Sequence, residues 1–199
     1  MTQLLISFCN VFPKGLALGI YDYDKEEFGW IDFHKINENV MGSNGISSYN
    51  EKYYVVTQLQ VGGVSGLVAF NKQDLQILDI HRLKESNDAH SLIAHDNGFL
   101  IADTGKNRLV KITLTNRDTE INETEFWSYN NDGKDTVHLN SMAKLGNEIF
   151  VTIFGTKPQE GWKKAKFGKI INITTNQTVF ENLHHPHSIT VIDEKLLLL

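Results

Sequence analysis

Short runs of β-branched and aromatic residues alternate with polar turns along the whole chain. Residues 53–57, for example, read Tyr-Tyr-Val-Val-Thr and follow the polar turn 50–52. Runs of this kind, bounded by Gly, Asn and Asp, are typical of strands joined by hairpins. No segment keeps an apolar period of 3.6 residues, so we expect little helix. The pattern therefore predicts an all-β protein.

One arrangement of polar and apolar positions recurs four times. An Asn or His is followed by a small or apolar pair, a polar turn and then an apolar run. The copies recur at intervals of roughly 47 residues, a period typical of repeat architectures. The repeats start near Asn44, His90, Asn140 and His187.

Each full repeat has room for four antiparallel strands, which is the size of one blade of a β-propeller. A single blade cannot bury both of its faces, whereas blades packed around an axis bury them against one another. We therefore predict one β-propeller domain over residues 1–199, with about four visible four-stranded repeats.

Both ends of the chain predict partial blades. Residues 4–8, 15–22 and 27–33 resemble the second to fourth strands of a blade, and residues 187–199 resemble a first and second strand. Either the C-terminal strand completes the N-terminal blade in a closed four-bladed ring, or the chain is a fragment of a larger, five- to seven-bladed propeller. The sequence favours the fragment, because the apolar residues 196–199 would otherwise form an edge strand prone to aggregation.

The first strand of a propeller blade lines the central channel, so the repeated Asn or His is expected at one depth in every blade. A second column, two positions earlier, should share its face because strand side chains alternate with a period of two. The first column contains Asn44, His90, Asn140 and His187, and the second contains Gly42, Asp88, His138 and His185.

These columns have four interpretations, which the sequence leaves open. They can satisfy backbone groups at strand starts and so be structural. They can bind a small polar ligand, such as a sugar or an acid, through Asn44, His90, Asn140, His185 and His187, with Trp162 from a long link covering the channel. They can hold one divalent metal ion, with His90, His138, His187, Asn140 and Asp88 as candidate ligands. Finally, His138, His187 and Asp88 are candidate catalytic residues, since an imidazole can act as a general base.

Composition narrows the classes of partner. The formal net charge is −5, and the cluster Lys163, Lys164, Lys166 and Lys169 is interpreted as a solvated loop, so we expect no nucleic-acid partner. Cys9 is the single cysteine and excludes an internal disulfide bond. Neither a signal sequence nor a membrane-spanning run is recognisable, which predicts a cytoplasmic protein without a membrane partner.

Two sets of residues carry a family resemblance. Residues 103–109 (Asp-Thr-Gly-Lys-Asn-Arg-Leu) resemble the core of the NHL-type propeller repeat. Residues 138–142, 161–162 and 186–188 resemble an uncharacterised bacterial propeller family, a domain of unknown function. Members of that family are longer than this chain, which again implies a fragment, and the resemblance implies no activity.

A more distant resemblance, based on Asn and His at inner-strand starts, is to the gluconolactonase and paraoxonase propellers. That resemblance implies a catalytic calcium ion in the channel. Only Asn44 and Asn140 match its ligands loosely, His replaces Asn in two blades, and the expected Glu is not visible. Zinc or manganese suits the donors better than calcium, which prefers several oxygen ligands.

Three functions follow from these residues. The first is a binding propeller that holds a small polar ligand at the channel mouth without turnover. The second is a metal-dependent hydrolase or lyase of the lactonase type. The third is a protein-interaction scaffold, so the sequence leaves open whether the chain binds another protein. Whether the chain is an enzyme is therefore undecided by its sequence.

Overall fold

The computed structural model describes residues 2–9, 15–33, 40–59, 63–115 and 120–198, which form antiparallel sheets joined by turns. The N-terminal sheet contains β1 (Gln3–Ser7), β2 (Leu18–Asp22) and β3 (Glu27–Ile31). The second contains β4 (Gly42–Tyr49), β5 (Lys52–Gln58), β6 (Val64–Asn71) and β7 (Ile77–Asn87). The third contains β8 (Ala89–His95), β9 (Gly98–Asp103), β10 (Arg108–Thr115) and β11 (Glu120–Ser128).

The fourth sheet contains β12 (Leu139–Leu145), β13 (Glu148–Ile153), β14 (Gly168–Asn172) and β15 (Gln177–Leu183). A hairpin of β16 (Thr190–Ile192) and β17 (Lys195–Leu197) ends the described chain. Two single-turn 3₁₀ helices, η2 (Thr104–Lys106) and η3 (Trp162–Lys164), lie in the links. The expectation of an all-β chain with little helix is confirmed.

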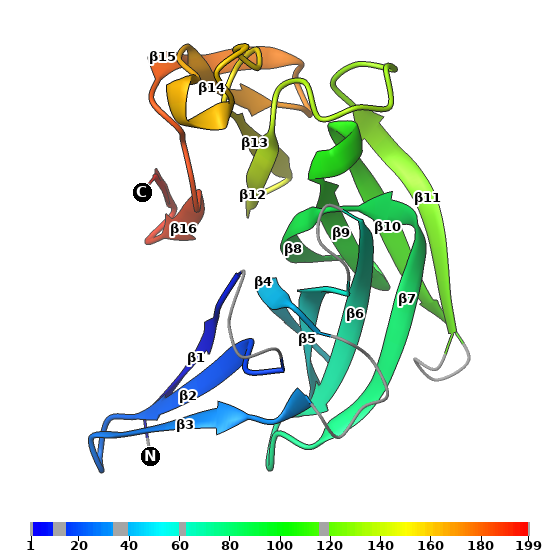
Figure 1. Ribbon diagram of the computed structural model, residues 1–199, viewed down its shortest axis with the longest axis vertical. Helices are drawn as coiled ribbons and strands as arrows, with labels where there is room; N and C mark the ends of the chain where they lie inside the picture. The colour runs from blue at the N-terminus through cyan, green and yellow to red at the C-terminus, as the bar shows by residue number, and fades with distance from the viewer. Residues whose placement is uncertain (1, 10–14, 34–39, 60–62, 116–119, 199) are drawn as a thin grey trace.

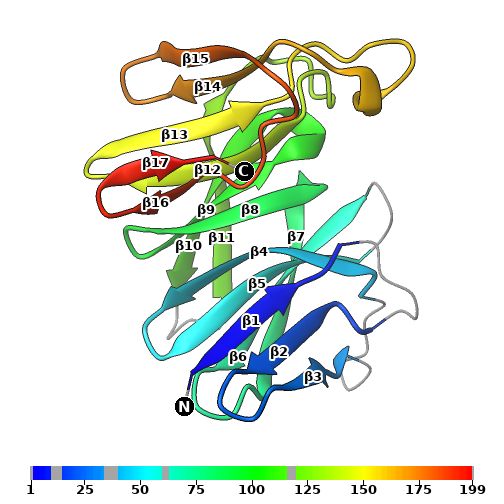
Figure 2. The same ribbon diagram turned by 90° about the vertical axis from the view of Figure 1, so that its left-hand side faces the viewer.

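The sheets follow one another around an arc in chain order, as the blades of a propeller do (Figure 1). Their first strands β4, β8 and β12 lie side by side toward the middle of the arc, between the N-terminal sheet and the C-terminal hairpin (Figure 2). In the described chain β16 pairs only with β17, and β1 pairs only with β2. The closed four-bladed ring is therefore wrong, and the fold is a partial propeller.

The core lies between the sheets in successive layers. In β5, Val55 packs toward the N-terminal sheet in a cluster with Phe33 and Phe70. Its neighbours Tyr54 and Val56 point the other way and pack with Phe99 and other residues of the third sheet. Because strand side chains alternate, a strand covered on both faces is apolar at nearly every position. This explains why the second strand of each repeat is an unbroken apolar run.

A register shift interrupts the first strand of every complete blade. The shifts fall between Ser43 and Ile46, between Ala89 and Ser91, and between Leu139 and Met142. Immediately before the second and third of these strands, Asp88 and His138 adopt positive φ angles of 51° and 52°. The prediction that both columns share one face of an extended strand is thus wrong for these two blades, because Asp88 and His138 have left-handed backbone, whereas Gly42 of the earlier column lies in β4.

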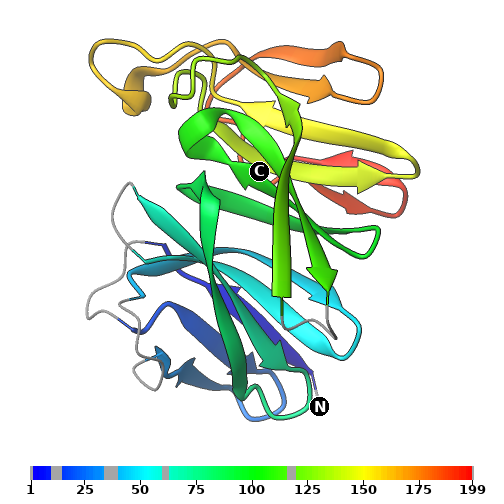
Figure 3. The same cartoon turned by 90° about the vertical axis from the view of Figure 1, so that its right-hand side faces the viewer.

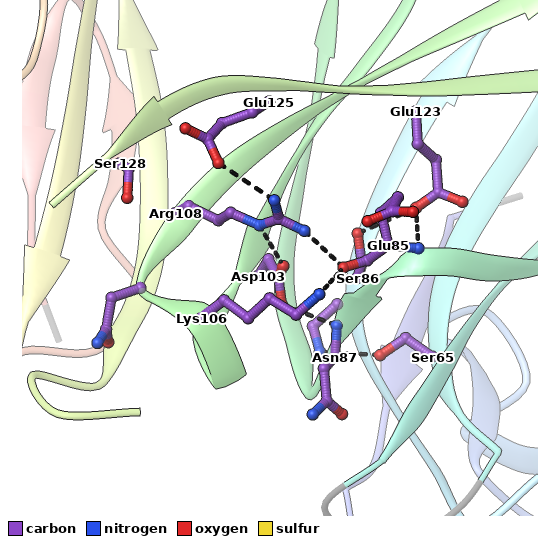
Figure 4. A network of polar contacts seen from close by, with 12 residues as sticks. Ser65, Glu85, Ser86, Asn87, Asp103, Lys106, Arg108, Glu123, Glu125 and Ser128 are labelled. Atoms are coloured by element: carbon purple, nitrogen blue, oxygen red, sulfur yellow. Dashed lines mark hydrogen bonds and ion pairs between the residues drawn. The ribbon is translucent and has the colours of Figure 1, made fainter. Parts of the chain in front are cut away.

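The NHL-like segment joins three neighbouring sheets, and Figure 4 shows its contacts between the second and the third. Asp103 is fully buried, and its carboxylate accepts hydrogen bonds from the Asn87 backbone at 2.7 Å and from Arg108 Nε at 2.8 Å. Arg108 also donates to the Glu85 carbonyl at 2.6 Å, which ties the third sheet to the end of β7. In the other direction, the Thr104 hydroxyl donates to the Leu139 carbonyl at 2.5 Å. The predicted turn is present, with Asn107 in the left-handed region at φ 52°. Asp103, however, bonds Asn87 and Arg108 and not the turn backbone, so the motif chiefly holds the blades together.

Candidate functional site

A hollow of ≈ 360 Å³ opens where the first strands begin, at the middle of the arc. Its lining is made of hydroxyl, amide, imidazole and thiol side chains together with small residues. The residues come from β1 and the segment just after it, from β4, β5, β8 and β12, and from the segment before β16, so stretches from all parts of the described chain are needed to form it. The lining residues are Ser7, Cys9, Ser43, Asn44, Gly45, Gln58, His90, Ser91, Asn140, Ser141, His187, Ser188 and Ile189.

Some of these polar residues also fasten one blade to the next. The Asn44 amide donates to the Ala89 carbonyl at 2.9 Å. The Ser91 hydroxyl accepts the backbone N–H of Met142 at 3.4 Å, and the Ser141 hydroxyl accepts that of Ile189 at 3.1 Å. Ser91 and Ser141, the small residues that follow His90 and Asn140, therefore have a structural role. They let the first strands approach closely, and their hydroxyl groups accept hydrogen bonds from the next blade.

His90 bridges two blades through both of its ring nitrogens. Its Nδ1 accepts a hydrogen bond from the Asn140 side-chain amide at 3.2 Å, and its Nε2 lies 3.4 Å from Asp88 Oδ1. The other partner of that carboxylate oxygen is the Gln58 amide, at 3.1 Å. The hydrogen bond from His90 holds the pKa of Asp88 below its usual value, against the opposing effect of burial. With both nitrogens engaged, His90 has no lone pair free for a metal ion.

His138 is held by a carboxylate that the sequence alone did not indicate. Its Nδ1–H donates to Asp135 Oδ2 at 3.1 Å, and its backbone N–H donates to Asp135 Oδ1 at 3.1 Å. The Trp162 indole N–H donates to the same Oδ2 at 3.0 Å, and its ring stacks at 4.9 Å from the imidazole. Asp135 thus fixes the Nδ1–H tautomer of His138, which leaves Nε2 as the acceptor.

His185 and His187 lie on the other side of the same aromatic group. His185 Nε2–H donates to the Trp162 carbonyl at 2.8 Å. The Phe154 ring lies 5.1 Å from the His185 ring, 5.0 Å from that of His187 and 4.5 Å from that of His138. Partial burial, followed by the neighbouring imidazoles, lowers the pKa of His187, so that this ring is neutral at pH 7.

The structure separates the predicted site residues into two groups. Asn44, His90, Asn140 and His187 line the hollow. A second group does not line the hollow. Asp88 and His138 contact His90, whereas Trp162 contacts His138 and the ring of His185 contacts Phe154.

Sequence reasoning missed Asp135, Phe154 and Gln58. Asp135 precedes His138 by three residues, a spacing that suits a carboxylate capping a turn, and this was the one available signal. Gln58 ends β5 and Phe154 directly follows β13, so both lie at the end of a buried second strand. Nothing in their local sequence points to the hollow.

The residues give a metal ion no ready-made site. In the ranges that the structure describes, no three His, Cys, Asp or Glu side chains are placed to hold one ion together. His90 and His138 each have a nitrogen bound to a carboxylate, and Asn140 donates to His90. The metal site with His90, His138, His187, Asn140 and Asp88 therefore stays a prediction.

No family model and no curated protein sequence matches the chain. Among solved structures it is similar to a protein from Lactobacillus plantarum, with a TM-score of 0.57 and 12% identity, over 94% of this chain and 55% of that one. It is also similar to Kuenenia stuttgartiensis hydrazine synthase, with a TM-score of 0.51 and 9% identity, over 88% of this chain and 45% of that one. The chain thus spans about half the length of the structures it matches.

These similarities show the fold alone: the chain is a β-propeller repeat protein, present here as a partial set of blades. The propeller part of the predicted resemblance is confirmed. The narrower resemblances, to the uncharacterised bacterial family and to the lactonase-type propellers, stay predictions. Among the described residues no helix is long and apolar enough to cross a membrane, and the cytoplasmic location is likewise still a prediction.

Proposed function

We propose that this propeller binds a small, uncharged, hydroxyl-rich ligand in the central hollow. The observation that carries the proposal is the lining itself: its described residues supply amide, imidazole and hydroxyl groups and include no Lys, Arg, Asp or Glu. A charged ligand would lose its hydration there without gaining an opposite charge. A neutral ligand with several hydroxyl groups would find both donors and acceptors.

Several lining groups have hydrogen-bonding capacity left over. The His187 imidazole is held neutral by its surroundings and can both donate and accept. The Ser43 hydroxyl is buried and has no hydrogen-bond partner among the described residues. Buried polar groups without a protein partner are commonly satisfied by water or a ligand. Ser43 lies in β4 and His187 lies just before β16, with β8 and β12 between these two elements. This separation suits a ligand that spans the hollow.

The test uses related pyranose sugars of different charge. Saturation-transfer NMR with D-glucose, D-glucuronate and D-glucosamine should show binding of glucose in preference to both charged forms. Replacing His187→Ala should reduce that signal, whereas His184→Ala, an exposed histidine on the same segment that does not line the hollow, should leave it unchanged. Equal signals from the three sugars, or no effect of His187→Ala, would count against this function.

A second candidate function, hydrolysis or elimination, is favoured by the Asp135–His138 pair. A carboxylate that fixes the Nδ1–H tautomer leaves the opposite nitrogen free to accept a proton, as a general base must. Trp162 and Phe154 both contact this imidazole, with ring centroids at 4.9 Å and 4.5 Å from it. This function would use His138 as the base and Asp135 as its positioning residue, with the hollow beside His90 as the binding site.

Turnover of two neutral probes, γ-butyrolactone and p-nitrophenyl acetate, tests the second function. Hydrolysis above the background rate that is lost in both His138→Gln and Asp135→Asn would support it. The same rate in the wild type and in both variants would exclude this second function. Elemental analysis of the same samples, with and without His187→Ala, tests the predicted metal ion independently.

A further inference from the structure

A second pocket, of ≈ 490 Å³, lies on the outer side of the fourth sheet and is separate from the central hollow. It is formed by the link between β13 and β14 and by the segment that precedes β12. Figure 3 shows these two segments, in yellow to orange and in yellow-green, together at one corner of the molecule. Backbone hydrogen bonds from Phe154 to Val137 and from Lys157 to Thr136 join them. The lining residues are Tyr129, Ile153, Gly155, Thr156, Lys157, Pro158, Lys164, Lys166, Phe167 and Lys169.

The charge of this pocket is of one sign. Four lysines line it, and none of its described lining residues carries a carboxylate. Glu160 is the single acidic residue between positions 157 and 169, and it is not among the lining residues. Lys157 lies over the Trp162 ring at 5.0 Å, and none of the four lining lysines makes an ion pair with another described residue. In a chain with a formal charge of −5, this is a local positive field that attracts an anion.

An exposed aromatic ring stands beside these lysines in an unusual backbone conformation. Phe167 is 66% exposed and has a φ of 64°, a region that bulky side chains rarely adopt. Its backbone packs closely against Gly155, where an added Cβ would lie 2.5 Å from the Lys166 carbonyl oxygen and 3.0 Å from that of Phe167. Tyr129, 39% exposed, supplies a second aromatic ring to the lining. Strained residues of this kind concentrate at ligand sites.

We propose that this pocket binds a phosphate-bearing ring compound of the nucleoside monophosphate class. The lysines would hold the phosphate as point charges, and Phe167 and Tyr129 would contact the planar base. Ile153 and Pro158 supply apolar surface for the rest of the ligand. The volume falls within the range of roughly 300–1,000 Å³ that is usual for small-molecule sites. The proposal is independent of the function of the central hollow.

Isothermal titration calorimetry on the full chain with AMP, adenosine and inorganic phosphate tests the proposal. AMP should bind, and adenosine and phosphate should each bind at least about tenfold more weakly, because each lacks one half of the recognised chemistry. The AMP affinity should fall as salt is raised. The double variant Lys164→Ala with Lys166→Ala should lose at least about tenfold in affinity. The control Lys84→Ala with Lys195→Ala, which removes the same charge from other exposed positions, should bind normally.

Phe167→Gly separates the aromatic contribution from stability. Glycine adopts a positive φ without strain, so this variant should melt no lower than the wild type while binding AMP more weakly. Absence of AMP binding, equal binding of inorganic phosphate, or unchanged affinity in the lysine double variant would overturn the proposal. Binding of a single-stranded oligonucleotide without binding of AMP would also overturn it, in favour of a nucleic-acid surface.

Discussion

The Asn140 side-chain amide donates a hydrogen bond to His90 Nδ1 across the boundary between the third and fourth sheets, at 3.2 Å. Both residues belong to the repeated column, and they lie fifty positions apart in the chain. The column therefore does more than line a hollow: it joins adjacent blades at their inner ends.

Removing this amide should destabilise the protein. Asn140 is 5% exposed, and Asn140→Ala leaves the His90 ring nitrogen without its donor, so we expect a loss of about 1–3 kcal/mol in the free energy of unfolding. Urea denaturation measures it. Asn131→Ala, at an exposed turn position, is the control and should change little. Equal stabilities for both variants would mean that the inter-blade bond contributes nothing.

Close approach of the first strands should make Gly45 irreplaceable. A Cβ at this position would lie 2.5 Å from the Leu92 backbone nitrogen, so Gly45→Ala must push the second and third blades apart, at about 1–3 kcal/mol. Gly29 is the matched control, because its nearest neighbour would lie at an ordinary 3.7 Å from an added Cβ. Thermal unfolding should show a lower Tm for Gly45→Ala alone. A Tm near the wild-type value in that variant would contradict the described packing.

The two carboxylates that contact Arg108 should differ greatly in importance. Asp103 is fully buried, and Asp103→Ala leaves the guanidinium and the Asn87 backbone N–H without their partner, a loss of about 3–5 kcal/mol. The Glu125 side chain is 51% exposed, and its 3.1 Å pair with Arg108 should be worth less than about 1 kcal/mol. Chemical denaturation of Asp103→Ala and Glu125→Ala compares them directly. A similar loss in both variants would show that burial does not set the energy of this network.

His187 should make stability depend on pH below neutrality. Its pKa in the folded protein is lowered from 6.5, chiefly by burial, so the unfolded chain takes up a proton first as the pH falls. Stability should therefore fall as the pH drops from 6.5 through the folded pKa. Above pH 6.5, the titration of His187 should leave stability unchanged. Unfolding free energies of the wild type minus those of His187→Ala, measured from pH 5 to 8, isolate the effect. A difference that grows toward low pH would have the opposite sign and contradict it.

The contents of the site were only partly predictable. Asn44, His90, Asn140 and His187 could be aligned from the repeat alone, since equivalent positions in successive blades reach the same depth. Asp135 could not be placed, because its contact with Trp162 depends on how a long link folds back over the neighbouring segment.

The earlier column shows the same limit in another form. Its alternation with the inner column assumes an extended strand, but the positive φ of Asp88 and His138 turns the chain just before the strand begins. Asp and His adopt the left-handed region more readily than most residues. The bulge that follows each of them depends on pairing with the next strand, which the local sequence does not show.

The sequence by itself determined the strands, the period of the repeat and the layered core, because apolar runs bounded by turn residues can be buried in few other ways. It also determined the turn within residues 103–109, because Asn107 tolerates the left-handed region that the turn needs. Only the tertiary structure decided that the arc stays open, that the column residues bond across blades, and that lysines and an exposed phenylalanine share a pocket. These features depend on distances between segments remote in the chain, which local pattern does not encode.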